Sequence, residues 1–168
     1  MIAVLMVVAA CAPRGAGLRG VFRNASSPIY SIASFDQRRL EGKWDQVAVF
    51  ASQGALGCKP GAVDFTSQPT SVKAKYQLCL SVGEVIGGGS IEMTGPGRFS
   101  VSGKDGLDQD WWVLWVDESY RTMAIGNPSG AFGFILNRGR ALPADRLKAA
   151  TEVFDFNGYD TTKLSVLR

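Results

Sequence analysis

Short apolar stretches, each broken by a turn signal, repeat along the chain from Trp44 to Arg138. Several of them alternate apolar and polar residues, as strands with one buried face do. The breaks carry glycine and proline, as in Gly95-Pro96-Gly97, which turn a chain tightly. The pattern predicts eight strands, at 44–51, 61–66, 72–82, 85–94, 98–102, 110–117, 121–126 and 132–138. Eight short consecutive strands favour an all-β fold, an eight-stranded antiparallel up-and-down β-barrel, because closure removes the exposed strand edges.

One helix is predicted, after the last strand. Pro143 suits its first turn, Leu147, Ala150 and Phe154 fall on one face, and Asn157-Gly158 ends it. We expect this C-terminal helix to pack against the outside of the barrel. The triplet Gly87-Gly88-Gly89 is interpreted as a flexible turn.

The N-terminal residues differ from the rest of the chain. Residues 2–8 form an uninterrupted apolar run, which is shorter than the roughly 20 residues that cross a bilayer, and Ala9-Ala10-Cys11 follows it. The run predicts a signal peptide over 1–10, and Val8-Ala9-Ala10-Cys11 resembles the lipobox of bacterial lipoproteins, whose cysteine is acylated. The expected organisation is therefore a lipidated N-terminus and tether over 11–31 and a barrel domain over 32–168, with Cys11 holding the protein to a membrane. The alternative is a buried N-terminal strand with an incidental cysteine.

Composition and charge narrow the functions. With 168 residues, 46% of them hydrophobic, the chain suits one domain with its own core. The net charge of +3 is small and the basic residues are scattered, which argues against nucleic acid as a partner. The chain contains no histidine, and no motif for nucleophilic, metal or phosphoryl chemistry is found, so neither an enzyme nor a metal or cofactor is expected.

Cys58 and Cys79 remain once Cys11 is assigned to lipid. An exported protein keeps such a pair oxidised more often than reduced, so we expect a disulfide between them. A metal site or a nucleophile is the competing interpretation, which the absence of histidine makes poor.

Three short motifs resemble the signatures of the lipocalins. The stretch 35–44, which contains Gly42-Lys43-Trp44, resembles the first signature, Asp117-Glu118-Ser119-Tyr120 the second, and Ile135-Leu136-Asn137-Arg138 the third. The terminal helix and the segment 156–160 are similar to the bacterial and apolipoprotein D-like branch, many of whose bacterial members are outer-membrane lipoproteins. The resemblance covers residues 32–167. It implies a protein of the bacterial outer membrane, facing the periplasm, that binds, stores or transports a hydrophobic small molecule such as a fatty acid or lysophospholipid.

The candidate residues fall into two groups. The first closes one end of the barrel, where stacking of Arg138 on Trp44 would gain ~1 kcal/mol; it comprises Gly42, Trp44, Asp117, Tyr120 and Arg138. The second is expected to face a ligand; period-two counting places Gln46, Ala48 and Phe50, and Phe132, Phe134 and Leu136, on the inner face. Trp111, Val113 and Trp115 are taken as the inward set of the strand 110–117, although this strand is apolar at both parities and its cavity-lining face stays open.

Two other functions stay open at this point. A barrel can catalyse an isomerisation through a tyrosine or a carboxylate, so a small-molecule isomerase is one alternative. The aromatic residues can also fill the barrel completely, because a narrow eight-stranded barrel can be packed shut or hold one small ligand. A structural envelope lipoprotein with a filled barrel is the second alternative.

Overall fold

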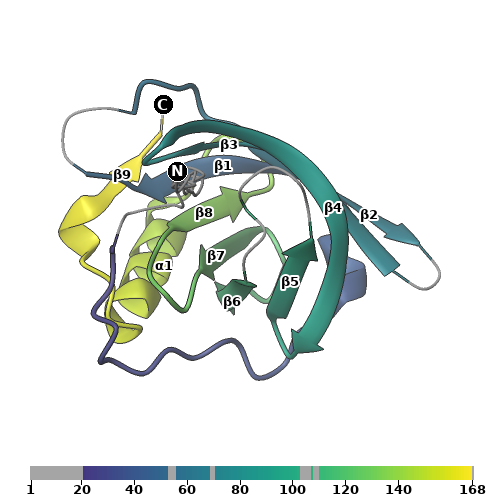
Figure 1. Cartoon of the computed structure of the whole chain (residues 1–168), viewed down its shortest axis with the longest axis horizontal. Helices are drawn as coiled ribbons and strands as arrows, with labels where there is room; N and C mark the ends of the chain where they lie inside the picture. The colour runs from purple at the N-terminus through teal and green to yellow at the C-terminus, as the bar shows by residue number, and fades with distance from the viewer. Residues whose placement is uncertain (1–20, 53–55, 69–70, 103–106, 108–109, 168) are drawn as a thin grey trace, which may run out of the picture.

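The protein is a closed antiparallel β-barrel with one α-helix outside it, as the sequence predicts (Figure 1). The computed structural model describes residues 21–52, 56–68, 71–102, 107 and 110–167. Neighbouring strands pair in the order β2-β3-β4-β5-β6-β7-β8-β1, and β1 also pairs with β2, which closes the barrel. The barrel strands are β1 (Gly42–Phe50), β2 (Ala62–Gln68), β3 (Ser71–Leu80), β4 (Gly83–Gly95), β5 (Arg98–Ser102), β6 (Asp110–Val116), β7 (Thr122–Gly126) and β8 (Gly133–Asn137).

A short ninth strand was not predicted. Strand β9 (Leu164–Val166) pairs with the last three residues of β1, while the first four residues of β1 pair with β2. A 3-10 helix, η2 (Thr161–Lys163), leads into β9, and another, η1 (Gln37–Leu40), precedes β1. Strand β9 thus extends the sheet along the end of β1 that β2 leaves uncovered.

Helix α1 (Ala144–Phe156) lies outside the barrel and contacts β6 and β7 (Figure 1). It begins directly after Pro143 and ends at Phe156; Asn157 caps it, and Gly158 follows with a φ of 78°, a value that favours glycine. Ala150 and Phe154 are its fully buried residues. Within the described residues, no helix is long and apolar enough to cross a membrane.

The buried residues form two separate cores. The interior core lies inside the barrel and includes Trp44, Trp111 and Phe134. The outer core lies between the barrel wall and α1 and includes Phe50 and Phe154. Each strand of the wall between them therefore buries both of its faces, which explains why β7 and β8 are apolar at every position except their ends.

The glycine triplet lies inside a strand, which corrects the expected flexible turn. Residues Gly87, Gly88 and Gly89 sit in the middle of β4 and pair with Tyr76, Lys75 and Ala74 of β3. A Cβ atom on Gly87 would lie 2.6 Å from the hydroxyl oxygen of Tyr76. The glycine there makes room for the ring of Tyr76, which is a packing role that turn composition alone does not reveal.

The segment 21–31 packs against the barrel, although the sequence predicted a tether up to residue 31. Phe22 is 2% exposed and belongs to the outer core, and its ring lies 6.1 Å from that of Phe50. The buried guanidinium of Arg23 donates hydrogen bonds to the carbonyl oxygens of Asn157, Pro128 and Ser27. Residues 21–31 thus belong to the folded domain. The predicted signal peptide, Cys11 and the first part of the tether lie outside the described residues.

Candidate functional site

One end of the barrel, which we call the plugged end, is closed by η1 and by the predicted pair Trp44 and Arg138. The guanidinium carbon of Arg138 lies 4.3 Å from the centre of the indole ring of Trp44. The indole nitrogen of Trp44 donates to the carbonyl oxygen of Leu40, at 2.7 Å. Arg138 donates to the carbonyl oxygens of Tyr120 (3.1 Å), Arg39 (2.8 Å) and Leu40 (3.3 Å). These bonds tie the plug to the first and last barrel strands.

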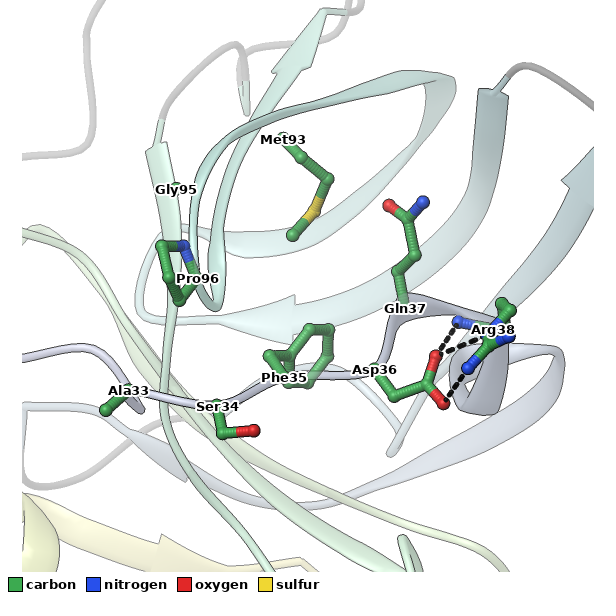
Figure 2. Close-up of a pocket in the computed structure, with 9 residues that line it drawn as sticks. All are labelled: Ala33, Ser34, Phe35, Asp36, Gln37, Arg38, Met93, Gly95 and Pro96. Atoms are coloured by element: carbon green, nitrogen blue, oxygen red, sulfur yellow. Dashed lines mark hydrogen bonds and ion pairs between the residues drawn. The ribbon is translucent and has the colours of Figure 1, made fainter.

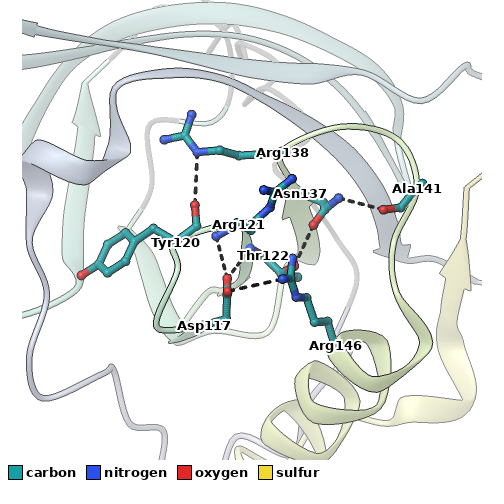
Figure 3. A network of polar contacts seen from close by, with 8 residues as sticks. All are labelled: Asp117, Tyr120, Arg121, Thr122, Asn137, Arg138, Ala141 and Arg146. Carbon is teal, nitrogen blue, oxygen red and sulfur yellow. Dashed lines mark hydrogen bonds and ion pairs between the residues drawn. The ribbon is translucent and has the colours of Figure 1, made fainter.

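The turn between β6 and β7 supports the same end (Figure 3). The carboxylate of Asp117 accepts hydrogen bonds from the backbone N–H groups of Arg121 and Thr122, both at 2.6 Å. Tyr120 has a φ of 53°, and its hydroxyl group accepts a hydrogen bond from the backbone N–H of Asp36, at 2.8 Å. Burial, together with the nearby charge of Arg121, lowers the pKa of Arg138. The polar groups of Asp117, Tyr120 and Arg138 thus form hydrogen bonds within the protein itself. These bonds hold the plugged end closed, which is the structural role that the sequence predicted.

Gly42 completes this end. Its φ of 95° favours glycine, and a Cβ atom there would lie 3.4 Å from a guanidinium nitrogen of Arg138. A glycine therefore lets the chain turn into β1 directly beneath the arginine.

Cys58 and Cys79 form the expected disulfide, with their Cα atoms 5.5 Å apart. Next to it, the side-chain amide of Gln46 donates to the carbonyl oxygen of Cys79 and accepts from its N–H, both at 2.8 Å. Gln46 was predicted to face a ligand. Its amide is instead satisfied by the backbone of β3.

The interior wall contains five of the predicted ligand-facing residues. All of them are at most 1% exposed and belong to the interior core: Trp111, Val113, Phe132, Phe134 and Leu136. The ring of Trp111 lies 5.3 Å from that of Phe134 and 6.2 Å from that of Phe132. Their contact with a ligand remains a prediction.

Three other predicted residues face the helix, not the interior: Ala48, Phe50 and Trp115. The cause is a β-bulge in each strand. In β1 the pairing with β8 shifts between Gln46 and Ala48, and in β6 the pairing with β7 shifts between Val113 and Trp115. The extra residue reverses the faces beyond it, so period-two counting fails from that point on. Phe50 accordingly packs against Phe154 of α1, with ring centres 4.8 Å apart.

Tyr76 is an interior residue that the sequence reasoning missed. It is 3% exposed, and its ring lies 5.5 Å from that of Trp111. The signal was present, because β3 alternates apolar and polar residues from Val72 to Leu78. Tyr76, Trp111, Phe132 and Phe134 form an aromatic cluster, and we keep this name for these four residues below.

A groove of about 560 Å³ lies at the plugged end (Figure 2). It is lined by residues 33–38 of the segment before β1 and by Met93, Gly95 and Pro96 around the turn between β4 and β5. Its one carboxylate, that of Asp36, accepts hydrogen bonds from Arg38, which hold the pKa of Asp36 below its usual value. The acid of this groove is thus paired and exposed, unlike a catalytic acid with a raised pKa.

These features define a class, the small closed β-barrels that have one plugged end, an apolar interior and a single outer helix. The sequence identifies the family, because a family model described as a lipocalin-like domain matches residues 35–168. The chain belongs to the lipocalin family.

Comparisons with individual proteins agree with this assignment. Temperature-induced lipocalin-1 of Arabidopsis thaliana is 36% identical over 55 residues, which make up 33% of this chain and only 30% of the plant protein. Among solved structures, insecticyanin of the tobacco hornworm Manduca sexta superposes with a TM-score of 0.61 at 12% identity, covering 84% of both chains. Lobster apocrustacyanin A1 gives a TM-score of 0.59 at 15% identity, covering 79% of this chain and 78% of its own. A biogenic amine-binding protein gives 0.63 at 8% identity, covering 83% and 85%. Identities this low establish the fold alone.

Proposed function

We propose that this lipocalin binds a small hydrophobic molecule, a fatty acid or a lysophospholipid, inside its barrel. The observation that carries the proposal is the interior wall, in which aromatic and aliphatic side chains of all eight barrel strands face one another above a plugged end. Such a wall favours an apolar guest, because burial of apolar surface is the main driving force for binding one. Among the structural neighbours, one is named for binding biogenic amines, and a siderocalin is described as having dual ligand specificities.

We further propose that the protein is a lipoprotein of the bacterial outer membrane, from the apolipoprotein D-like branch of the family. The support is in the sequence, where Val8-Ala9-Ala10-Cys11 follows an apolar run. Lipid chains on Cys11 would hold the barrel at a membrane, since each buried methylene adds about 0.8 kcal/mol. Such an anchor would bring the barrel close to a source of acyl lipids.

Ligand binding is tested with the purified full chain. Native mass spectrometry is expected to show a co-purifying lipid, and titration with lysophosphatidylcholine is expected to change the tryptophan emission. Phe132→Ala removes a buried ring of the interior wall and should weaken binding about tenfold, since such a ring contributes on the order of 1.5 kcal/mol of burial. Phe156→Ala, on an exposed ring of α1, is the matched control and should leave the affinity unchanged. A ligand-free mass together with unchanged emission would refute carriage of a lipid.

Anchoring is tested separately in a bacterial host. Cys11→Ser should move the protein from the membrane fraction to the soluble periplasm. Wild-type protein and a Cys58→Ser, Cys79→Ser variant serve as controls and should both stay with the membrane. Unchanged membrane fractionation of Cys11→Ser would exclude lipidation at this cysteine.

A further inference from the structure

The indole N–H of Trp111 is a hydrogen-bond donor that finds no acceptor in the part of the chain that the structure describes. Trp111 is fully buried, and its Nε1 atom has no hydrogen-bond partner among the residues that the structure describes. Trp44 forms a direct contrast, since its indole nitrogen donates to the carbonyl oxygen of Leu40. Buried polar groups are almost always hydrogen-bonded, because removing them from water without a partner costs free energy. The unpaired N–H group of Trp111 therefore indicates a site where a bound molecule supplies the acceptor.

The position of Trp111 along the barrel limits the kind of molecule that can supply the acceptor. Trp111 is the second residue of β6, and the turn that follows β6 lies at the plugged end. Its side chain is therefore far from the plug, among the other rings of the aromatic cluster. Below it, towards Trp44, the interior is lined by aliphatic side chains such as Val113 and Leu136. An elongated ligand would meet the N–H group near its polar end and the aliphatic wall along its tail.

The acceptor should be uncharged. Among the described residues, two charged residues are buried, Arg23 and Asp45, and neither faces the interior. Arg23 donates to carbonyl oxygens beside α1, and Asp45 follows the inward-facing Trp44 on the strand and lies 3.2 Å from Lys43. An ionised carboxylate at Trp111 would thus be buried without a cation, which is strongly unfavourable.

We propose that the Nε1–H group of Trp111 donates a hydrogen bond to an ester carbonyl oxygen of the ligand. This inference rests on the proposed function and narrows it to esterified acyl lipids, such as lysophospholipids, in preference to ionised fatty acids. The carbonyl lies at Trp111, the acyl tail extends towards the plugged end, and the polar head extends towards the opposite end of the barrel.

The test compares two ligands that differ in the carbonyl group alone. One is an acyl lysophosphatidylcholine, and the other is the alkyl ether lysophosphatidylcholine with a chain of equal length. Wild-type protein should bind the acyl lipid about three- to tenfold more tightly, the fold-change that a hydrogen bond of ordinary net strength produces. Trp111→Phe keeps a ring in place but lacks the donor, so the two affinities should become equal. The effect of the smaller ring on packing cancels in the ratio, because both ligands meet the same ring.

Trp112→Phe is the matched control. Trp112 neighbours Trp111 but faces outward, with the guanidinium of Arg98 4.1 Å from its ring centre. Its replacement should leave the preference for the acyl lipid intact. A second measurement needs no variant: the indole N–H resonance of Trp111 in wild-type protein should shift downfield with the acyl lipid and much less with the ether.

The outcomes separate this inference from the proposed function. Equal affinity of wild-type protein for both lipids, or equal loss of preference in both variants, would overturn the role of Trp111 while lipid binding stands. Binding of neither lipid would overturn the proposed function itself. If Trp111→Phe does not fold, as judged by circular dichroism, the resonance measurement decides the question.

Discussion

Replacing Arg138 with methionine should destabilise the barrel without changing what it binds. Methionine keeps much of the apolar stem of the side chain but removes the guanidinium. The change therefore removes the stacking on Trp44 and the hydrogen bonds to the carbonyl oxygens of Tyr120, Arg39 and Leu40. All of these contacts lie at the plugged end, away from the aromatic cluster.

The expected loss of unfolding free energy is about 2–3 kcal/mol. A cation stacked on an indole contributes about 1 kcal/mol when partly exposed. The two shorter hydrogen bonds, at 3.1 and 2.8 Å, contribute about 1 kcal/mol each, since solvent reaches this guanidinium and weakens them. The bond to Leu40 is longer, at 3.3 Å, and Trp44 also donates to that oxygen, so it adds little. Burial of the guanidinium, which lowers the pKa of Arg138, offsets part of the gain.

Urea unfolding followed by far-ultraviolet circular dichroism measures the effect. We expect a lower midpoint at an unchanged slope for Arg138→Met and an intermediate midpoint for Arg138→Lys, which keeps the charge but not the planar fork. Arg140→Met removes the same charge from an exposed side chain and should stay within about 0.5 kcal/mol of wild type. A double-mutant cycle with Trp44→Phe isolates the stacking. Equal stability of Arg138→Met and Arg140→Met, or a large loss of lipid affinity in Arg138→Met, would refute a purely structural closure.

Three further predictions concern stability. Gly133→Ala should cost about 1–3 kcal/mol in urea unfolding, because its Cβ atom would lie 2.8 Å from the ring of Phe50 and 2.9 Å from that of Tyr159; Gly57→Ala, with open space around its Cβ, is the control, and equal midpoints would contradict this packing. Reducing the disulfide, whose cysteines are 21 residues apart, should cost about 3 kcal/mol, measured as the midpoint with and without reductant; an unchanged midpoint would argue against it. Burial raises the pKa of Tyr159 from 10.0 to about 12, so the unfolded chain ionises first and stability should fall by up to about 1.4 kcal/mol per pH unit between these values; Tyr159→Phe should lack this slope, and an identical slope in both proteins would assign it to other groups.

Most of the fold could be predicted because its signals are local. Several barrel strands alternate apolar and polar residues or are apolar throughout, and most tight connections carry glycine or proline, the turn between β6 and β7 being an exception. The end of α1 is equally local, since Gly158 supplies the positive φ that follows it. Trp44 and Arg138, which close the barrel, are far apart in the sequence, but the signature motifs around them allow the pair to be predicted.

The features that the sequence did not predict depend on packing partners far along the chain. Strand β9 has three residues and exists because the end of β1 lacks another partner there. The segment around Phe22 looks like a linker by composition, yet its ring fits beside Phe50 in the outer core. Neither partner can be identified from the segment itself.

The misplaced ligand-facing residues follow from one physical cause. In β1 and β6 both faces are buried, so hydrophobicity does not tell an inward residue from an outward one. Period-two counting then depends entirely on an unbroken register, and a single bulge reverses every assignment beyond it. In β8, where the pairing with β7 is regular, the inward assignments of Phe134 and Leu136 were correct, as was that of Phe132 directly before the strand. In β6, Trp111 and Val113 lie before the bulge, so counting placed them correctly on the inner face. Trp115 lies beyond it and packs instead against the outer core under α1.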